Sequence, residues 1–153
     1  MILKLSLFRN IPLYLVSALV LLSACSNSTS SDEEEHADPK GFVLSMNGAD
    51  IVTQLSGGTI SGEIELKLGD ETDLITIYFF DENGDRFQPD EPEYSLGYEF
   101  EKDGIAEFEQ HSDDGKWSFH IHADTVGVTD LKLKLMHGDH SDFTTQDIQV
   151  HVE

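Results

Sequence analysis

Four of the seven histidines in this chain lie within residues 117–143, as two close pairs. His120 and His122 are separated by one residue, and His137 and His140 are separated by two. Neutral imidazole is a good ligand for Zn²⁺, Cu²⁺ and Ni²⁺, so these spacings predict that at least one pair binds a divalent transition metal. The competing interpretation is that polar residues simply gather at the ends of strands and in turns.

The second pair carries its own carboxylates. Asp139 and Asp142 share a loop with His137 and His140. A carboxylate can bind zinc directly or can orient a ligand imidazole from the second coordination shell, which makes zinc the first expectation. Met136 precedes the pair, and a thioether suits Cu(I), so copper stays open as the alternative metal.

The first pair has the cleaner ligand spacing. In a strand, residues two apart point to the same face, so His120 and His122 would lie about 7 Å apart and could both reach one ion. The apolar residues that alternate with them, Trp117, Phe119 and Ile121, would then face the core. This pair is therefore a second candidate metal site.

Period-two alternation of apolar and polar residues extends over most of the second half of the chain, and no long segment shows a helical period. Turn-forming Gly, Asp and Asn separate the alternating segments. The pattern predicts an all-β antiparallel sandwich of about seven strands. The expected strands are Glu63–Leu68, Thr72–Phe80, Tyr94–Glu101, Ile105–Glu109, Lys116–His122, Thr129–Met136 and Thr145–Val152.

Two stretches, "GIAEFEQ" and "KWSFHIHADTVGVTDLKLKL", resemble bacterial immunoglobulin-like domains. Gly127 and the alternating Leu131, Leu133 and Leu135 occupy the matching places, and the resemblance extends over about residues 60–152. It implies an immunoglobulin-like sandwich. It implies no particular function, because such sandwiches have many roles.

In such a sandwich, alternate loops meet at one end. The loop after residue 80 carries six acidic side chains, the next loop at that end carries His111, and the third carries His137 and His140. We therefore expect an end rich in imidazole and carboxylate. If residues 123–128 form a hairpin, His122 lies roughly 25 Å from His137, which favours two separate metal sites over a single one.

The N-terminus has the composition of an export signal. Lys4 and Arg9 precede an apolar run over Ile11–Leu22, which is too short to be a membrane span. The run ends in Leu-Ser-Ala-Cys, which resembles the bacterial lipoprotein signal, in which the cysteine, here Cys25, is acylated and becomes the first residue. Acylation of Cys25 would anchor the protein to membrane lipid in the cell envelope. Ser26 follows instead of the aspartate associated with inner-membrane retention, which favours the outer membrane over the inner membrane.

The predicted organisation has three parts. A small, polar and acidic segment follows Cys25 and has too little apolar surface to fold. The remaining residues are enough for one domain with one core. The predicted parts are a signal peptide over residues 1–24, a lipidated acidic tether over residues 25–41 and an immunoglobulin-like domain over residues 42–153.

The chain is strongly acidic, with a formal net charge of −21. This charge excludes a general binding surface for nucleic acid or anionic lipid, and it favours cations or a basic protein partner. Cys25 is the single cysteine, so no disulfide can form within the chain.

The sequence also lacks the motifs of common catalytic sites, namely a Gly-x-Ser-x-Gly turn, a P-loop and a zincin helix. We therefore expect an envelope lipoprotein that is not an enzyme and that binds zinc for buffering, for sensing or for delivery to a transporter or another envelope protein. The alternative is a metal-free adhesion or assembly module whose acidic loops bind a protein.

Overall fold

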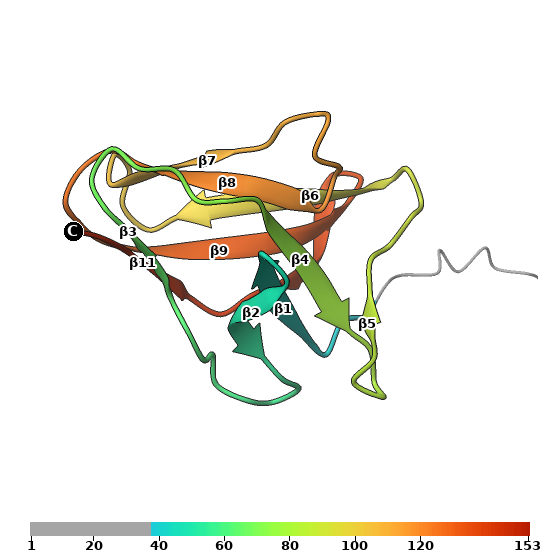
Figure 1. Cartoon of the computed structure of the whole chain (residues 1–153). Helices are drawn as coiled ribbons and strands as arrows, with labels where there is room; N and C mark the ends of the chain where they lie inside the picture. Colours follow the sequence, from blue (N-terminus) through green and yellow to red (C-terminus); the bar gives the residue numbers. More distant parts are fainter. Residues whose placement is uncertain (1–37) are drawn as a thin grey trace, which may run out of the picture. The chain divides into compact units, whose positions relative to one another are not determined.

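The computed structural model describes residues 38–153, which form eleven strands and no helix. The strands form two sheets that enclose one hydrophobic core (Figure 1), so the predicted all-β sandwich is confirmed. Within these residues there is thus no helix long and apolar enough to cross a membrane. The strands are β1 Gly41–Met46, β2 Ala49–Gln54, β3 Ile64–Leu66, β4 Ile75–Phe80, β5 Arg86–Phe87, β6 Tyr94–Phe100, β7 Ala106–Glu109, β8 Ser118–Ala123, β9 Gly127–His137, β10 His140–Thr144 and β11 Ile148–Val152.

The first sheet has the order β2-β1-β4-β8-β7, with β5 beside β4. The sequence analysis did not predict β1 or β2. The turn between them is Asn47-Gly48, and both residues have positive φ, at 55° and 79°. An Asn-Gly pair is the usual signal of a two-residue hairpin turn, so the sequence did carry a sign of this hairpin. Residues 41–44 of β1 are buried at successive positions, so this strand shows no alternation of apolar and polar residues.

The second sheet is built around β9, which pairs with β6 on one side and with β10 and β11 on the other. Leu131, Leu133 and Leu135 of β9 are fully buried, as their alternation predicts. Strand β3 joins the sheet by pairing in parallel with β11. This parallel pair and the eleven strands correct the prediction of a wholly antiparallel sandwich of about seven strands.

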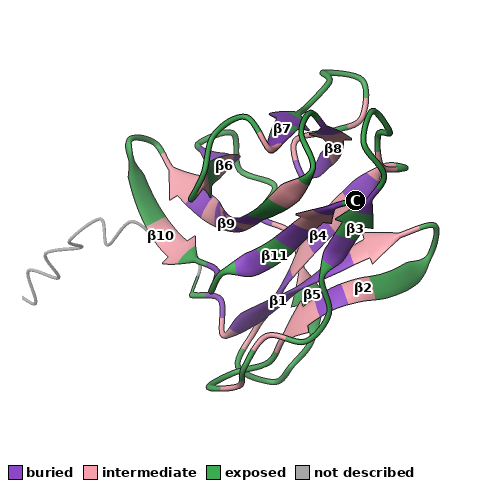
Figure 2. Ribbon diagram, turned by 90° about the vertical axis from the view of Figure 1, so that its left-hand side faces the viewer, coloured by how far each residue is buried: buried purple, intermediate pink, exposed green. Residues whose placement is uncertain are grey.

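Aromatic side chains from both sheets fill the core. Trp117, Phe119 and Ile121 are buried, which confirms the predicted inner face of β8. The Phe119 ring stacks on that of Phe108 at a centroid distance of 4.7 Å, and Phe79 contacts Trp117 edge to face at 5.6 Å. Figure 2 shows the buried positions along β1, β4, β9 and β11, and exposed positions in the loops.

The expected hairpin through residues 123–128 is wrong. Strand β8 pairs with β4 and β7 in the first sheet, whereas β9 belongs to the second sheet. The connection therefore crosses from one sheet to the other (Figure 1). Both strands have one apolar face, and each buries that face in the same core from opposite sides. Alternation reveals the buried face of a strand but not its sheet, so the distance estimated from the hairpin does not hold.

Residues just before position 42 also contact the sheet. The Lys40 backbone N–H donates to the Phe80 carbonyl over 2.7 Å, and Pro39 is buried. The predicted signal peptide, Cys25 and most of the tether lie outside the described residues.

Candidate metal centres

Two groups of histidine and aspartate within residues 38–153 have ligand atoms close enough to bind a metal. In each group, one ligand atom from each of three residues lies within 4.8 Å of the others. His137, His140 and Asp142 form the first group, and His111, Asp114 and His120 form the second. The structure keeps the predicted pair His137 and His140 together. It separates the predicted pair His120 and His122, because His120 is grouped with His111.

A tight turn and a β-bulge build the first group. Strand β9 ends at His137, Gly138 and Asp139 form the turn, and β10 begins at His140, directly opposite His137. The φ of Gly138 is 59°, a value that favours glycine. The register of β10 against β9 then shifts between Ser141 and Phe143, and a bulge of this kind redirects the side chain of the extra residue, here Asp142.

Asp142 lies between the two imidazoles. Its Oδ1 is 3.1 Å from His140 Nε2 and its Oδ2 is 3.7 Å from His137 Nδ1. The Asp142 side chain is only 7% exposed, and that of His137 is 15% exposed, while His140 is half-exposed. The His137 ring stacks on Tyr94 of β6 at 4.6 Å, which holds one ligand against the sheet. The remaining predicted carboxylate, Asp139, is fully exposed, with its Oδ1 3.7 Å from His140 Nδ1.

The second group joins a loop to a strand. His120 lies in β8, and its side chain is 16% exposed. His111 and Asp114 lie in the loop between β7 and β8, where the Asp114 N–H donates to the His111 carbonyl over 3.1 Å. His120 Nε2 is 3.6 Å from Asp114 Oδ2, and the rings of His111 and His120 are 5.7 Å apart.

His122 belongs to neither group. It shares the outer face of β8 with His120, as predicted, but its Nδ1 donates a hydrogen bond over 2.9 Å to Asp124 Oδ1. This hydrogen bond raises the pKa of His122 above its ordinary value of 6.5, and the nearby charges of Asp124, Glu71 and Glu107 act in the same direction. A raised pKa favours the proton over a metal ion on this imidazole.

We expect an NMR titration of chelator-treated protein to give His122 a pKa above 6.5, and Asp124→Asn to bring that pKa back towards the ordinary value. A raised native pKa adds stability that is fully present below the unfolded-state pKa and is lost as the pH rises through the native pKa. His122→Gln should therefore lower the free energy of unfolding more at about pH 5.5 than at about pH 8.5, as denaturant titrations can measure. A titration midpoint at or below 6.5 for His122 would contradict this assignment.

Met136 does not accompany His137. Alternation in β9 points the two side chains to opposite faces, and the Met136 side chain packs over Gly97, where an added Cβ would lie 3.3 Å from the sulfur. The sulfur therefore fills the space above a glycine of the neighbouring strand. In this position the thioether of Met136 is not a ligand of the first group, and copper stays an alternative metal only through the two imidazoles.

The predicted gathering of three loops is visible in their hydrogen bonds. Lys116 Nζ donates to the Glu91 carbonyl over 2.7 Å, and Trp117 Nε1 donates to the Pro89 carbonyl over 3.0 Å. On the other side, the Gly138 N–H donates to the Glu93 carbonyl over 3.0 Å. The acidic segment 81–93 thus contacts both the loop that carries the second group and the turn that carries the first.

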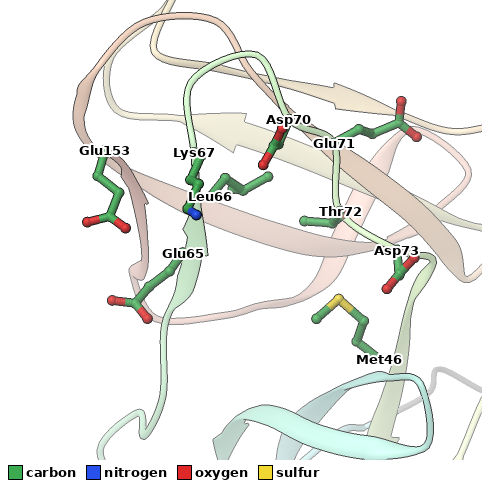
Figure 3. Close-up of a pocket in the computed structure, with 9 residues that line it drawn as sticks. All are labelled: Met46, Glu65, Leu66, Lys67, Asp70, Glu71, Thr72, Asp73 and Glu153. Carbon is green, nitrogen blue, oxygen red and sulfur yellow. The ribbon is translucent and has the colours of Figure 1, made fainter.

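An open pocket of about 350 Å³ lies elsewhere in the fold (Figure 3). Five carboxylates line it, and Met46, Leu66 and Lys67 lie among them. These acids are Glu65, Asp70, Glu71, Asp73 and Glu153. The pocket contains no histidine, so it lacks the mixed ligands of the two groups, although Glu71 also contacts His120.

Sequence reasoning named all the histidines of both groups but missed the grouping of Asp114 with His120. The two residues are brought together by the pairing of β7 with β8, in which Glu109 lies opposite His120. A prediction of this hairpin register, with His111 two residues beyond Glu109, would have revealed the contact.

Comparisons with known proteins do not assign a family. No protein-family model matches the chain, and no curated protein matches its sequence. Among solved structures, domains 4 and 5 of the S-layer protein SbsC are similar with a TM-score of 0.43 and 12% sequence identity. The match covers 66% of this chain and 63% of that one. A likeness at this level does not assign a function.

Proposed function

We propose that this chain is an envelope-anchored protein that binds a divalent transition metal, with zinc as the first expectation, at His137, His140 and Asp142. The observation that supports it best is a nearly buried aspartate between two imidazoles. Two imidazole nitrogens and a carboxylate in this arrangement are groups that a divalent metal ion can bind together.

The donor set fits zinc. Two imidazole nitrogens and one carboxylate oxygen are the ligands of many open zinc sites. Ligand atoms on one tetrahedral zinc lie about 3.3 Å from each other, given bond lengths near 2 Å. Asp142 Oδ1 lies 3.1 Å from His140 Nε2 and Asp142 Oδ2 lies 3.7 Å from His137 Nδ1, and one ligand atom of each residue lies within 4.8 Å of the other two. The three ligand atoms must therefore move closer together for the residues to bind one zinc ion.

Three protein ligands leave one position for water or for an exchanging ligand. The half-exposed His140 gives the solvent access to such a position. An ion held in this way can leave, which suits a protein that buffers zinc, senses it or delivers it to a transporter or another envelope protein. A closed four-ligand site would suit a purely structural ion better.

The anchor is the second part of the proposal. Acylation of Cys25, in an immunoglobulin-like lipoprotein of the outer membrane, would hold the domain at the membrane surface, with the acidic segment as a tether. Labelled fatty acid should enter the wild-type protein and not Cys25→Ser. Equal labelling of both proteins would refute acylation at Cys25.

The metal is tested by titrating the full chain in detergent with Zn²⁺ in a calorimeter. Replacing both His137 and His140 with alanine should weaken binding at this site at least about 100-fold, because a single carboxylate ligand remains. His151→Ala is the matched control, since His151 lies in β11 outside both groups. If the double variant binds as much zinc as the wild type, with the same affinity, the first group is not a metal site.

If the wild-type protein takes up no zinc at micromolar concentrations, the metal proposal fails as a whole. The acidic adhesion or assembly module predicted from the sequence would then be the better hypothesis. Its binding surface would be the segment 81–93, which carries six acidic side chains.

A further inference from the structure

We propose that His111, Asp114 and His120 form a second and independent zinc site, oriented by Glu71, and that zinc bound there fixes the β7–β8 loop against strand β8. This inference goes beyond the proposed function, because it concerns different ligands and a different effect of the metal. Either site can fail without the other.

The surroundings of His120 determine which nitrogen can bind a metal. His120 Nδ1 lies 2.9 Å from the Thr72 carbonyl oxygen, which can only accept, so Nδ1 carries the proton and donates it. Glu71 Oε1 lies 3.2 Å from the same nitrogen. In the neutral imidazole, Nε2 then holds a lone pair. A ligand histidine whose other nitrogen donates to a carbonyl or carboxylate is the usual arrangement in protein metal sites.

The acceptor for this proton is rigid. The Thr72 N–H donates to the Ile121 carbonyl over 3.0 Å, and Thr72 Oγ1 accepts from the Ile121 N–H over 3.0 Å. Two hydrogen bonds thus hold Thr72 to Ile121, the residue of β8 next to His120. The ring of His120 is held in one orientation before any metal arrives, which lowers the cost of ordering the ligand on binding.

The unprotonated nitrogen faces a carboxylate. His120 Nε2 and Asp114 Oδ2 are 3.6 Å apart, which is too far for a hydrogen bond and close to the spacing of two ligands on one zinc. Two lone pairs that face each other repel unless a cation lies between them. His111 supplies the third ligand atom within 4.8 Å, and Glu109 Oε1 lies 3.6 Å from His111 Nε2 and adds negative charge.

The lysine of this loop does not neutralise the group. Lys116 Nζ donates to the Glu91 carbonyl and lies 5.1 Å from the centre of the Trp117 ring. Its charge is thus directed towards the segment 81–93. The carboxylates of Glu71, Glu109 and Asp114 surround the histidines and favour a divalent cation.

The loop is fixed at its ends. Gln110 Nε2 donates to the carbonyls of Lys116 and Ser118 over 3.0 and 3.1 Å, which closes the base of the loop. His111 and Asp114 lie between these points. A metal that bonds both of them and His120 would link the middle of the loop to the sheet and reduce its freedom to open.

The test uses the full chain in detergent, with zinc as the ligand. Wild-type protein should bind two zinc ions, and Asp114→Asn should bind one, at the first group. Asp113→Asn, which removes a neighbouring charge of the same loop, is the matched control and should still bind two. Hydrogen exchange of residues 111–115 should slow on adding zinc to the wild type and to the variant that lacks His137 and His140, but not to Asp114→Asn.

Glu71 is tested as a positioning residue. Glu71→Gln should weaken zinc binding at the second site by about 10-fold to 100-fold, without changing the first site or the melting temperature of the zinc-free protein. Asp70→Asn removes the adjacent acid and should change neither affinity. The proposal is overturned if Asp114→Asn binds zinc like the wild type, if the wild type binds one ion that is lost with His137 and His140, or if zinc leaves the exchange of the loop unchanged. If the wild type instead binds a single zinc ion and Asp114→Asn abolishes that binding, the second site exists and the proposed function at the first group fails.

Discussion

Replacing Phe119 with alanine is expected to lower the free energy of unfolding by about 4 kcal/mol. Phe119 is fully buried near the start of β8 and stacks on Phe108 at 4.7 Å. It lies opposite Ile75 of β4, which is also fully buried, so the lost ring leaves a cavity that backbone pairing prevents from closing. Denaturant titration of the metal-free protein measures the change, which should lower the melting temperature by roughly 15 °C.

Leu68→Ala is the matched control for the Phe119 substitution. The Leu68 side chain is 54% exposed, so its truncation should change stability by less than about 0.5 kcal/mol. A loss of less than about 1 kcal/mol for Phe119→Ala would show that β8 does not pack in the core as the structure has it.

Replacing Gly62 with alanine is expected to cost at least about 3 kcal/mol, because strain and a steric clash add together. The φ of Gly62 is +91°, and a Cβ at this position would lie 2.0 Å from the Ile51 carbonyl oxygen. The backbone has little room to move, since Ser61 and Thr53 exchange two hydrogen bonds of 2.8 and 2.9 Å beside it. The variant should either fail to fold or show a markedly lower midpoint of denaturation.

Gly69→Ala separates the two causes of this loss. Its φ of +80° is similar, but no atom outside its chain neighbours lies within 4 Å of an added Cβ. Only the conformational cost applies there, which is about 1 kcal/mol. If Gly62→Ala and Gly69→Ala lowered the free energy of unfolding by the same amount, the close approach of Gly62 to β2 would not exist in solution.

The alternation of apolar and polar residues correctly predicts which face of most strands is buried. Leu131, Leu133 and Leu135 alternate with Lys132 and Lys134, and the structure buries the leucines completely. This inference works because side chains of a strand point alternately to opposite faces, whatever the strand pairs with. It failed for β1, because Phe42, Val43 and Leu44 are apolar and buried at successive positions, so this part of the strand shows no alternation.

The pairing of the strands could not be predicted from the sequence. The placement of β8 and β9 in different sheets and the parallel pairing of β3 with β11 depend on contacts between residues far apart in the chain. Several registers would bury the same alternating residues, and the packing of the whole core selects among them.

The candidate metal ligands were also predicted only in part from the sequence. The spacing of His137 and His140 was enough to place them together, because a two-residue turn between paired strands brings its flanking residues face to face. The inward direction of Asp142 depends on a bulge in β10, and the grouping of His120 with His111 and Asp114 depends on the pairing of β7 with β8. Local spacing determines neighbours along one strand. The ligands of a site that spans a strand and a loop are set by register, which is a property of the folded chain.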